Sequence, residues 1–239
     1  MSSDSVILQG VDLNFPSGKG LISSLKNLVS KNNDDFKALQ GINLKVKSGE
    51  VFGLIGKNGS GKSTILRIIA GIYAADAGKC EVRGSTSLLA GIGTGFSQHQ
   101  TGVENALLYG SILGHSEDAM KKLLPEIIAF SELGDFINKP LRTYSAGMKA
   151  RLGLAVASAI CPDILLIDEV LGVGDPQFRE KSKARILELV KKTGTVVIVS
   201  HSFGLLTDIC DRIGVVHEGE LKMIGEPKDA INAYYELTG

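Results

Sequence analysis

The feature that most constrains this chain is a glycine-rich turn between a short apolar strand and a helix. Val51–Ile55 is the predicted strand, and the helix is expected to begin near Lys62. Residues from Gly56 to Ser63 match the pattern G-x-x-x-x-G-K-[ST] in its required context, with a strand before it and a helix after it. Such a turn directs successive N–H groups at one anion, and the helix start adds its positive dipole end. The stretch therefore predicts a nucleotide phosphate site rather than a turn with an exposed lysine.

Each residue type in this turn has a physical task. The glycines allow backbone conformations that are closed to residues with a Cβ. Lys62 can reach the β- and γ-phosphates, and the Ser63 hydroxyl can hold Mg²⁺. The residues predicted to bind the nucleotide here are Gly56, Asn58, Gly59, Ser60, Gly61, Lys62, Ser63 and Thr64.

Two further apolar stretches end at polar residues. Residues 164–167 run into Asp168 and Glu169, and residues 195–199 are followed by His201. Continuous apolar runs of this length predict strands buried on both faces of a parallel sheet covered by helices, so the predicted fold class is α/β. Ligands bind at the carboxyl edge of such sheets. The glycine-rich turn, the acid pair and the histidine are therefore expected to meet around one triphosphate.

The acid pair is expected to divide the chemistry between its members. Adjacent side chains at a strand end point in opposite directions. Asp168 is assigned to the Mg²⁺ shell through water, because Mg²⁺ keeps most of its hydration. Glu169 is assigned to orient or deprotonate the attacking water, and His201 to contact the γ-phosphate. The alternatives are an acid pair that caps a helix and a structural histidine.

Composition and charge exclude other classes of protein. The 239 residues carry no net charge, so nothing in the balance indicates a nucleic-acid partner. The sequence shows no signal peptide and no window of about 18 apolar residues, which predicts a cytoplasmic protein that does not cross a membrane by itself. Cys80, Cys161 and Cys210 share no C-x-x-C spacing, so buried free thiols are expected.

The period of the apolar residues divides the rest of the chain into strands and helices. Residues 1–239 are expected to form a single domain, with an inserted helical subdomain at 102–141. Residues 42–46 are expected to form a β-hairpin with the phosphate strand. Residues 213–216 and 221–224 are expected to form a closing hairpin around a turn at Glu218-Gly219. The other expected elements are strands at 6–15, 80–82 and 87–89, and helices at 103–113, 118–130, around Phe136, from Ser145, from Pro176 to about 192 and from Pro227.

One segment, residues 18–35, differs from its surroundings. Its apolar residues between Leu21 and Val29 fall on one face of a short amphipathic helix. Such a helix is expected either to pack on its own domain or to contact a partner, and the pattern supports both.

The run Y-S-A-G-M from Tyr144 to Met148 resembles the signature of the ATP-binding cassette (ABC) family, Leu-Ser-Gly-Gly-Gln, in its serine and second glycine. With the phosphate turn, the acid pair and the histidine in the family's order, the resemblance covers residues 6–224. It implies a P-loop ABC nucleotide-binding domain with an antiparallel β subdomain, which binds ATP and Mg²⁺. It also implies a head-to-tail homodimer. Ser145 and Gly147 of one copy would meet the γ-phosphate bound by the other, and Asp175 would lie between the two sites.

Three stretches resemble the ATPase subunits that export bacterial surface polysaccharides. They are Y-S-x-G-M-x-x-R-L from Tyr144, V-G-D-P-Q-F from Val173 and G-x-G-F…T-G-x-E-N from Gly93. This resemblance implies an integral membrane permease as partner and a place at the cytoplasmic face of the inner membrane, peripheral through the permease. The implied cargo is a lipid-linked polysaccharide such as O-antigen, capsule or teichoic acid. The segment 18–35 resembles an exporter helix that gates polymer entry.

Two sites of the family stay open in this sequence. The aromatic residue that stacks on adenine is either Phe15 or Phe36, which stand on either side of the segment 18–35. The family's Q-loop is expected near Ile92, where there is no glutamine; Gln98 and Gln100 come later, so no Mg²⁺-binding glutamine is assigned.

Other classes of protein compete with a transport ATPase. A soluble ABC protein of DNA repair or chromosome structure would need a long coiled coil within 102–138, which is too short for one. An ABC protein of translation usually carries two cassettes in one chain, and the sequence shows one. A GTPase or a small-molecule kinase is a third alternative. A guanine site would require Asn-Lys-x-Asp, whereas Asn138-Lys139-Pro140-Leu141 lacks the aspartate. An ATP-driven exporter subunit is therefore predicted, with polysaccharide as cargo by analogy and another transported cargo as the alternative.

Overall fold

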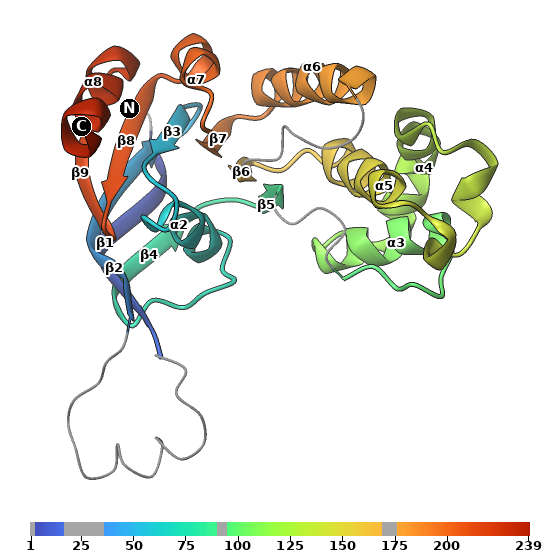
Figure 1. The fold of residues 1–239 in the computed structure, drawn as a ribbon. Helices are drawn as coiled ribbons and strands as arrows, with labels where there is room; N and C mark the ends of the chain where they lie inside the picture. Colours follow the sequence, from blue (N-terminus) through green and yellow to red (C-terminus); the bar gives the residue numbers. More distant parts are fainter. Residues whose placement is uncertain (1–2, 17–35, 90–94, 169–175) are drawn as a thin grey trace. The chain divides into compact units, whose positions relative to one another are not determined.

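A computed structural model describes residues 3–16, 36–89, 95–168 and 176–239, which form two compact units (Figure 1). Unit 1 consists of Met1–Arg83 and Val199–Gly239, and unit 2 of Gly84–Ile198. Both units contain strands and helices, as predicted for an α/β chain. The predicted amphipathic segment 18–35 lies outside the described residues.

Unit 1 contains an antiparallel sheet with the strand order β2-β1-β4. Its strands are β1 (Asp4–Phe15), β2 (Phe36–Lys47) and β4 (Ala77–Val82). Buried residues alternate with accessible ones along most of β2, the pattern of a strand with one face on the core. The strands predicted at 6–15 and 80–82 are confirmed.

The phosphate strand pairs with a different strand from the one that the sequence predicted. β3 (Val51–Ile55) pairs in parallel with β8 (Arg212–His217), which pairs antiparallel with β9 (Glu220–Gly225). The predicted closing hairpin of β8 and β9 is confirmed, but the hairpin of 42–46 with β3 is wrong because β2 pairs with β1. The burial patterns give the reason. A strand in which buried and accessible residues alternate, such as β2, has one face exposed to solvent. A strand that is buried along its length, such as β3, needs both faces covered.

Three described helices belong to unit 1, namely α2 (Lys62–Ile69), α7 (Phe203–Ile209) and α8 (Pro227–Thr238). α2 directly follows the phosphate turn, and α8 begins at Pro227, both as predicted. α7 was not predicted. It has 7 residues and buries only Leu206, so it carries too little apolar repeat to be read from the sequence.

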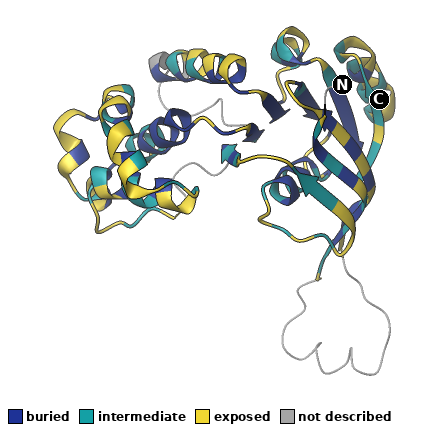
Figure 2. Ribbon diagram, turned by 180° about the vertical axis from the view of Figure 1, so that it is seen from behind, coloured by how far each residue is buried: buried dark blue, intermediate teal, exposed yellow. Residues whose placement is uncertain are grey.

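Unit 2 contains the apolar strand that ends at Asp168. β5 (Thr86–Leu89) and β6 (Ile164–Asp168) pair in parallel, and β7 (Thr195–Val199) begins in this unit. All residues of β6 except Asp168 are buried, as is the whole of β7 (Figure 2). The prediction that these apolar runs form fully buried strands is confirmed.

The helices of unit 2 were predicted almost in full. They are α3 (Gly102–Ile112), α4 (Glu117–Ser131), α5 (Ala146–Ala159) and α6 (Pro176–Lys192), with 3₁₀ turns at Gly134–Asn138 and Leu141–Thr143. α3 starts at a capping box of Thr101 and Glu104, and α4 at Ser116. None of the helices in the described ranges is long and apolar enough to cross a membrane.

The three cysteines are free, but they are not all buried. Cys210 is buried and Cys80 is half-buried, whereas Cys161 is exposed. The expectation of a buried thiol is therefore wrong for Cys161. This residue follows Ile160, the C-cap of α5, and so lies beyond the apolar stretch of that helix.

Candidate functional site

The turn between β3 and α2 has the backbone geometry of an anion site. Gly61 is the N-cap of α2, with φ at 108°, in the left-handed region that favours glycine. Within the described chain, no side chain caps this helix start and no acidic residue stands in its first turn. Among the described residues, no acidic side chain therefore offsets the positive dipole end of α2, which favours an anion at this position.

Two glycines of the turn are required by close packing. A Cβ at Gly56 would lie 2.2 Å from the carbonyl oxygen of Val216 in β8. A Cβ at Gly61 would lie 2.9 Å from the carbonyl oxygen of Ala38 in β2. Real Cβ atoms do not approach oxygen so closely, so the turn fits between β8 and β2 only with glycine at both positions.

Lys62 curls back over the turn that precedes it. Its Nζ donates hydrogen bonds of 2.8 Å to the carbonyl oxygens of Gly56 and Lys57, and the residue is buried. Both carbonyls are neutral, so they orient the ammonium without cancelling its charge. A buried cation held in this way is positioned to bind an anion that enters the turn.

The residues of the turn fit a phosphate group. Ser60 Oγ is buried and has no hydrogen-bond partner within the part of the chain that the structure describes. A buried polar atom without a partner is costly, and a phosphate oxygen would satisfy it. Ser63 stands in the first turn of α2, where its hydroxyl is a hard oxygen ligand of the kind that Mg²⁺ prefers.

The turn between β8 and β9 is hydrogen-bonded to the phosphate turn, a contact that the sequence did not indicate. Gly219 N donates to the carbonyl oxygen of Ser60 at 3.0 Å, and Gln40 N donates to the carbonyl oxygen of Gly219 at 2.8 Å. Gln40 Nε2 adds a hydrogen bond of 3.1 Å to the carbonyl oxygen of Glu218. The Glu218-Gly219 turn was visible in the sequence, but its contact with Ser60 depends on the fold alone.

Both candidates for the adenine-stacking residue lie in the same unit as the phosphate turn. Phe15 and Phe36 are register partners at the ends of β1 and β2. The Phe15 ring packs edge-to-face on Tyr73, with centroids 5.6 Å apart, whereas Phe36 is 61% exposed. Phe36 lies two residues before Ala38, which contacts the phosphate turn at Gly61. Phe36 thus presents the more open ring, and the choice between the two stays a prediction.

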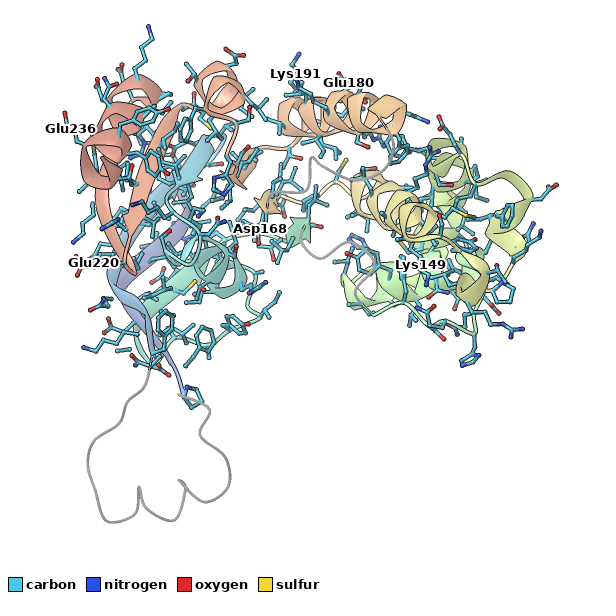
Figure 3. The ribbon with its side chains drawn as sticks, in the orientation of Figure 1. Lys149, Asp168, Glu180, Lys191, Glu220 and Glu236 are labelled. Atoms are coloured by element: carbon cyan, nitrogen blue, oxygen red, sulfur yellow. The ribbon has the colours of Figure 1, made fainter. Side chains whose placement is uncertain are left out.

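The other predicted catalytic residues are divided between the units. His201 is exposed in unit 1, between β7 and α7. Asp168 is half-buried at the carboxyl end of β6 in unit 2 (Figure 3). Glu169 and Asp175 lie outside the described residues. The meeting of the phosphate turn, the acid pair and His201 around one triphosphate therefore stays a prediction.

The start of α5 is a second helix N-terminus that borders a cavity. Ser145 is the N-cap, as predicted, and its Oγ accepts a hydrogen bond of 3.2 Å from Met148 N. A Cβ at Gly147 would meet nothing closer than Ser145 Oγ at 3.8 Å, so the glycine leaves room in front of the helix. Both residues line a cavity of about 650 Å³ in unit 2, together with Glu132, Leu133, Phe136, Met148 and Arg151.

Tyr144 stands where the ABC signature usually has leucine, and the structure gives it a packing role. The residue is buried, and its hydroxyl donates a hydrogen bond of 2.5 Å to the carbonyl oxygen of Phe136. Burial raises the pKa of this phenol, so it stays neutral. Tyr144 therefore fixes the chain that leads into Ser145.

Asn105 is a structural residue that sequence reasoning missed. It is fully buried, and its Oδ1 accepts a hydrogen bond of 2.7 Å from Ser97 N. Its Nδ2 donates to the carbonyl oxygens of Ser97, Gln100 and Thr101. This fixes the loop before α3, from which Gln98 Oε1 accepts a hydrogen bond of 2.9 Å from Lys149 in α5. The T-G-x-E-N pattern contained Asn105 without indicating this task.

Comparison with known proteins adds a family and a set of relatives. A family model described as ABC transporter matches residues 39–172. The chain is 44% identical to the O-antigen export system ATP-binding protein RfbB of Myxococcus xanthus over 83% of this chain and 46% of RfbB. It is 40% identical to the teichoic acids export ATP-binding protein TagH of Levilactobacillus brevis over 99% of this chain and 66% of TagH. It is 38% identical to the ABC transporter protein AbcA of Aeromonas salmonicida over 99% of this chain and 78% of AbcA. The chain thus spans less than two thirds of the length of RfbB and TagH.

Solved structures with a similar backbone are known. A dimeric ATP-binding cassette in a post-hydrolysis state, bound to ADP and Pi, superposes with a TM-score of 0.72 at 23% identity, covering 93% of this chain and 98% of that one. An ATP-binding subunit of an ABC transporter superposes with a TM-score of 0.74 at 21% identity, covering 98% of this chain and 94% of that one. At such identities the likeness concerns the fold.

Proposed function

This chain belongs to the ABC transporter family, and we propose that it is the ATP-hydrolysing subunit of an exporter that moves a lipid-linked surface polysaccharide across the inner membrane. The predicted fold class, an α/β ATP-binding cassette, is confirmed by the family match and by the solved cassettes. The observation that carries the ATP-hydrolysing role is the turn before α2, which combines a buried hydroxyl without a partner among the described residues, an oriented ammonium and a helix start without a side-chain cap. The relatives named for O-antigen and teichoic acid export support the cargo.

The phosphate turn is proposed to hold the β- and γ-phosphates of ATP. Its N–H groups and the Lys62 ammonium bind the phosphate oxygens, which also satisfy Ser60 Oγ. Ser63 and, through water, Asp168 would hold Mg²⁺, which would supply positive charge to offset that of the phosphates. Asn58, Gly59 and Thr64 complete the predicted set.

Hydrolysis is proposed to need residues outside the phosphate turn. Glu169 orients or deprotonates the attacking water, while His201 contacts the γ-phosphate and keeps the water aligned. Phe36 or Phe15 stacks on adenine, and the open ring of Phe36 favours Phe36. These roles follow the family order of the motifs.

We further propose that the active form is a head-to-tail homodimer. The start of α5 at Ser145 and Gly147 then meets the γ-phosphate held by the partner copy. The cavity in front of Gly147 supports this role, because glycine at this position leaves space that a phosphate would fill. An integral membrane permease would couple closure of the dimer to transport and hold the chain at the inner face of the membrane.

Replacement of the proposed base tests the hydrolytic role. Glu169→Gln keeps the shape of the side chain but removes the carboxylate, so ATP should bind and stay unhydrolysed. We expect the rate of phosphate release to fall by about 100-fold or more, the scale of general base catalysis, and a dimer to accumulate in size-exclusion chromatography with ATP. Rapid hydrolysis by this variant would remove Glu169 from the base role.

The cargo requires its own test, because the relatives include a protein named for O-antigen export and one named for teichoic acid export. The chain would be reconstituted in lipid vesicles with the membrane permease proposed as its partner. We expect lipid-linked O-antigen to raise the rate of ATP hydrolysis, and teichoic acid on the same lipid to leave it unchanged. The opposite result would assign teichoic acid as cargo. Stimulation by neither of these glycans nor by lipid-linked capsular polysaccharide would reject polysaccharide export.

A further inference from the structure

Glu132 connects two helices of unit 2 that carry the proposed chemistry. It is the C-cap of α4 and takes the left-handed conformation, with φ at 54°. One carboxylate oxygen pairs with Arg151 in α5 at 3.0 Å, and the other pairs with Lys181 in α6 at 2.5 Å. A single side chain at the end of α4 thus contacts both α5 and α6.

Two aromatic rings lie beneath these charges. The Arg151 guanidinium lies 4.5 Å from the centroid of the Phe178 ring, and the Lys181 ammonium lies 4.8 Å from that of the Phe130 ring. The two rings contact each other with centroids 5.8 Å apart, and Phe178 is buried. We call these residues, with Glu132, the α4–α6 clamp.

The clamp is more than an isolated surface ion pair. Lys181 Nζ also donates a hydrogen bond of 3.1 Å to the carbonyl oxygen of Phe130. The hydrogen bond from Lys181, with the nearby charges of Lys181 and Arg151, holds the pKa of Glu132 below its usual range, so the carboxylate is charged at neutral pH. Isolated exposed pairs contribute little, whereas charges joined in a network over aromatic rings restrict geometry.

The clamp contacts α5, which begins after Ser145, and α6, which begins after the segment that contains Glu169. Arg151 stands in the same helix as Ser145, and Glu132 and Arg151 line the cavity that Ser145 and Gly147 also line. Lys181 stands in α6, which begins at Pro176, immediately after the segment 169–175 that contains Glu169.

We propose that Glu132 is a positioning residue, which holds the start of α5 and the start of α6 in one geometry through Arg151 and Lys181. The inference rests on the proposed function, in which Ser145 serves the nucleotide of the partner copy and Glu169 serves the nucleotide of its own copy. A fixed angle between α5 and α6 makes the two groups arrive together when the dimer closes. ATP binding by the phosphate turn in unit 1 does not involve the clamp.

The test compares two glutamates that differ in what they connect. The side chains of Glu132 and Glu188 are each 47% exposed, and each carboxylate pairs with two cations. The partners of Glu188, Arg185 and Lys192, lie in α6 together with Glu188 itself. Arg185 also pairs with Glu126 in α4 and donates a hydrogen bond of 3.1 Å to the carbonyl oxygen of Ser158 in α5, but neither contact involves Glu188. Glu188→Gln therefore removes the same kind of charge without removing a bond between helices.

We expect Glu132→Gln to lower kcat for ATP hydrolysis by about tenfold, with KM and the nucleotide-induced rise in Tm unchanged. Lys181→Gln should cause a similar loss, and the double variant should lose little more than either single one. Glu132→Asp, which keeps the charge, should recover part of the rate, and Glu188→Gln should stay within about twofold of the wild type.

Three results would overturn the positioning role while the wild type hydrolyses ATP. They are a normal kcat in Glu132→Gln, an equal loss in Glu188→Gln, and losses of Glu132→Gln and Lys181→Gln that simply add in the double variant. A loss of rate that follows the fall of Tm among all the variants would assign the clamp to folding alone and would also overturn the proposal. A wild type without ATP hydrolysis at any concentration would instead reject the proposed function.

Discussion

At the scale of single residues, Lys62 gives the most direct test of the proposed ATP site. Lys62→Ala removes a buried ammonium that two carbonyls direct over the turn. Because charge-assisted hydrogen bonds contribute about 1.5–3 kcal/mol each, we expect ATP affinity to fall by about 100-fold or more. The measurement is the rise of Tm on addition of ATP, which should vanish.

The matched control for this prediction is Lys79→Ala, which removes an exposed lysine of unit 1 that pairs with Glu81. It should leave the ATP-induced rise of Tm intact. Unchanged protection in Lys62→Ala would argue against the phosphate assignment.

Thiol reactivity is also decided residue by residue. Burial, with a smaller effect of the Asp211 charge, raises the pKa of Cys210 to about 12, so its thiolate is scarce near pH 8. Cys161 is exposed. We expect iodoacetamide at pH 8 to label Cys161 within minutes and Cys210 only after denaturation, as measured by mass spectrometry of the intact chain and its peptides. Rapid labelling of Cys210 in the folded chain would contradict its burial.

At the scale of elements, the turn between β8 and β9 acts as a support for the phosphate turn. Gly219 has φ at 79°, and a Cβ there would lie 2.9 Å from the carbonyl oxygen of Ala38. Gly219→Ala should therefore both strain the backbone, by about 1–2 kcal/mol, and displace the hydrogen bond to Ser60. We expect a lower Tm and an ATP affinity reduced several-fold, measured by calorimetry.

Gly71→Ala separates strain from contact. Gly71 has φ at 72° in the same unit, but a Cβ there would meet nothing within 4 Å. The control should lower Tm similarly and leave ATP affinity unchanged. Equal affinities in the two variants would show that the β8–β9 turn does not support the site.

At the scale of the whole molecule, the proposed dimer can be tested by mixing two inactive variants. Lys62→Ala disables the phosphate turn, and Ser145→Arg disables the start of α5. In a mixed dimer, one site combines an intact phosphate turn from one copy with an intact α5 from the other. Mixing equal amounts should restore up to about a quarter of the wild-type ATPase rate, since half of the randomly paired dimers are mixed and each holds one intact site. No recovery after mixing would contradict a site shared between copies.

Much of this protein could be predicted from the sequence because its elements carry local signals. Apolar runs determined β3, β6 and β7, the glycines between Gly56 and Gly61 determined the phosphate turn, and Ser145 marked the start of α5. These features depend on backbone sterics and on the period of burial within a few residues. These local features identify the family without any knowledge of distant contacts.

Only the tertiary structure decided which distant residues meet. It paired β3 with β8 rather than with β2, placed Gly219 under Ser60, and joined Glu132 to Arg151 and Lys181. No local pattern encodes such contacts, because each partner alone is an ordinary turn, strand or surface charge. Their energy arises when burial of the apolar faces brings the elements together, so their identity is a property of the packed chain.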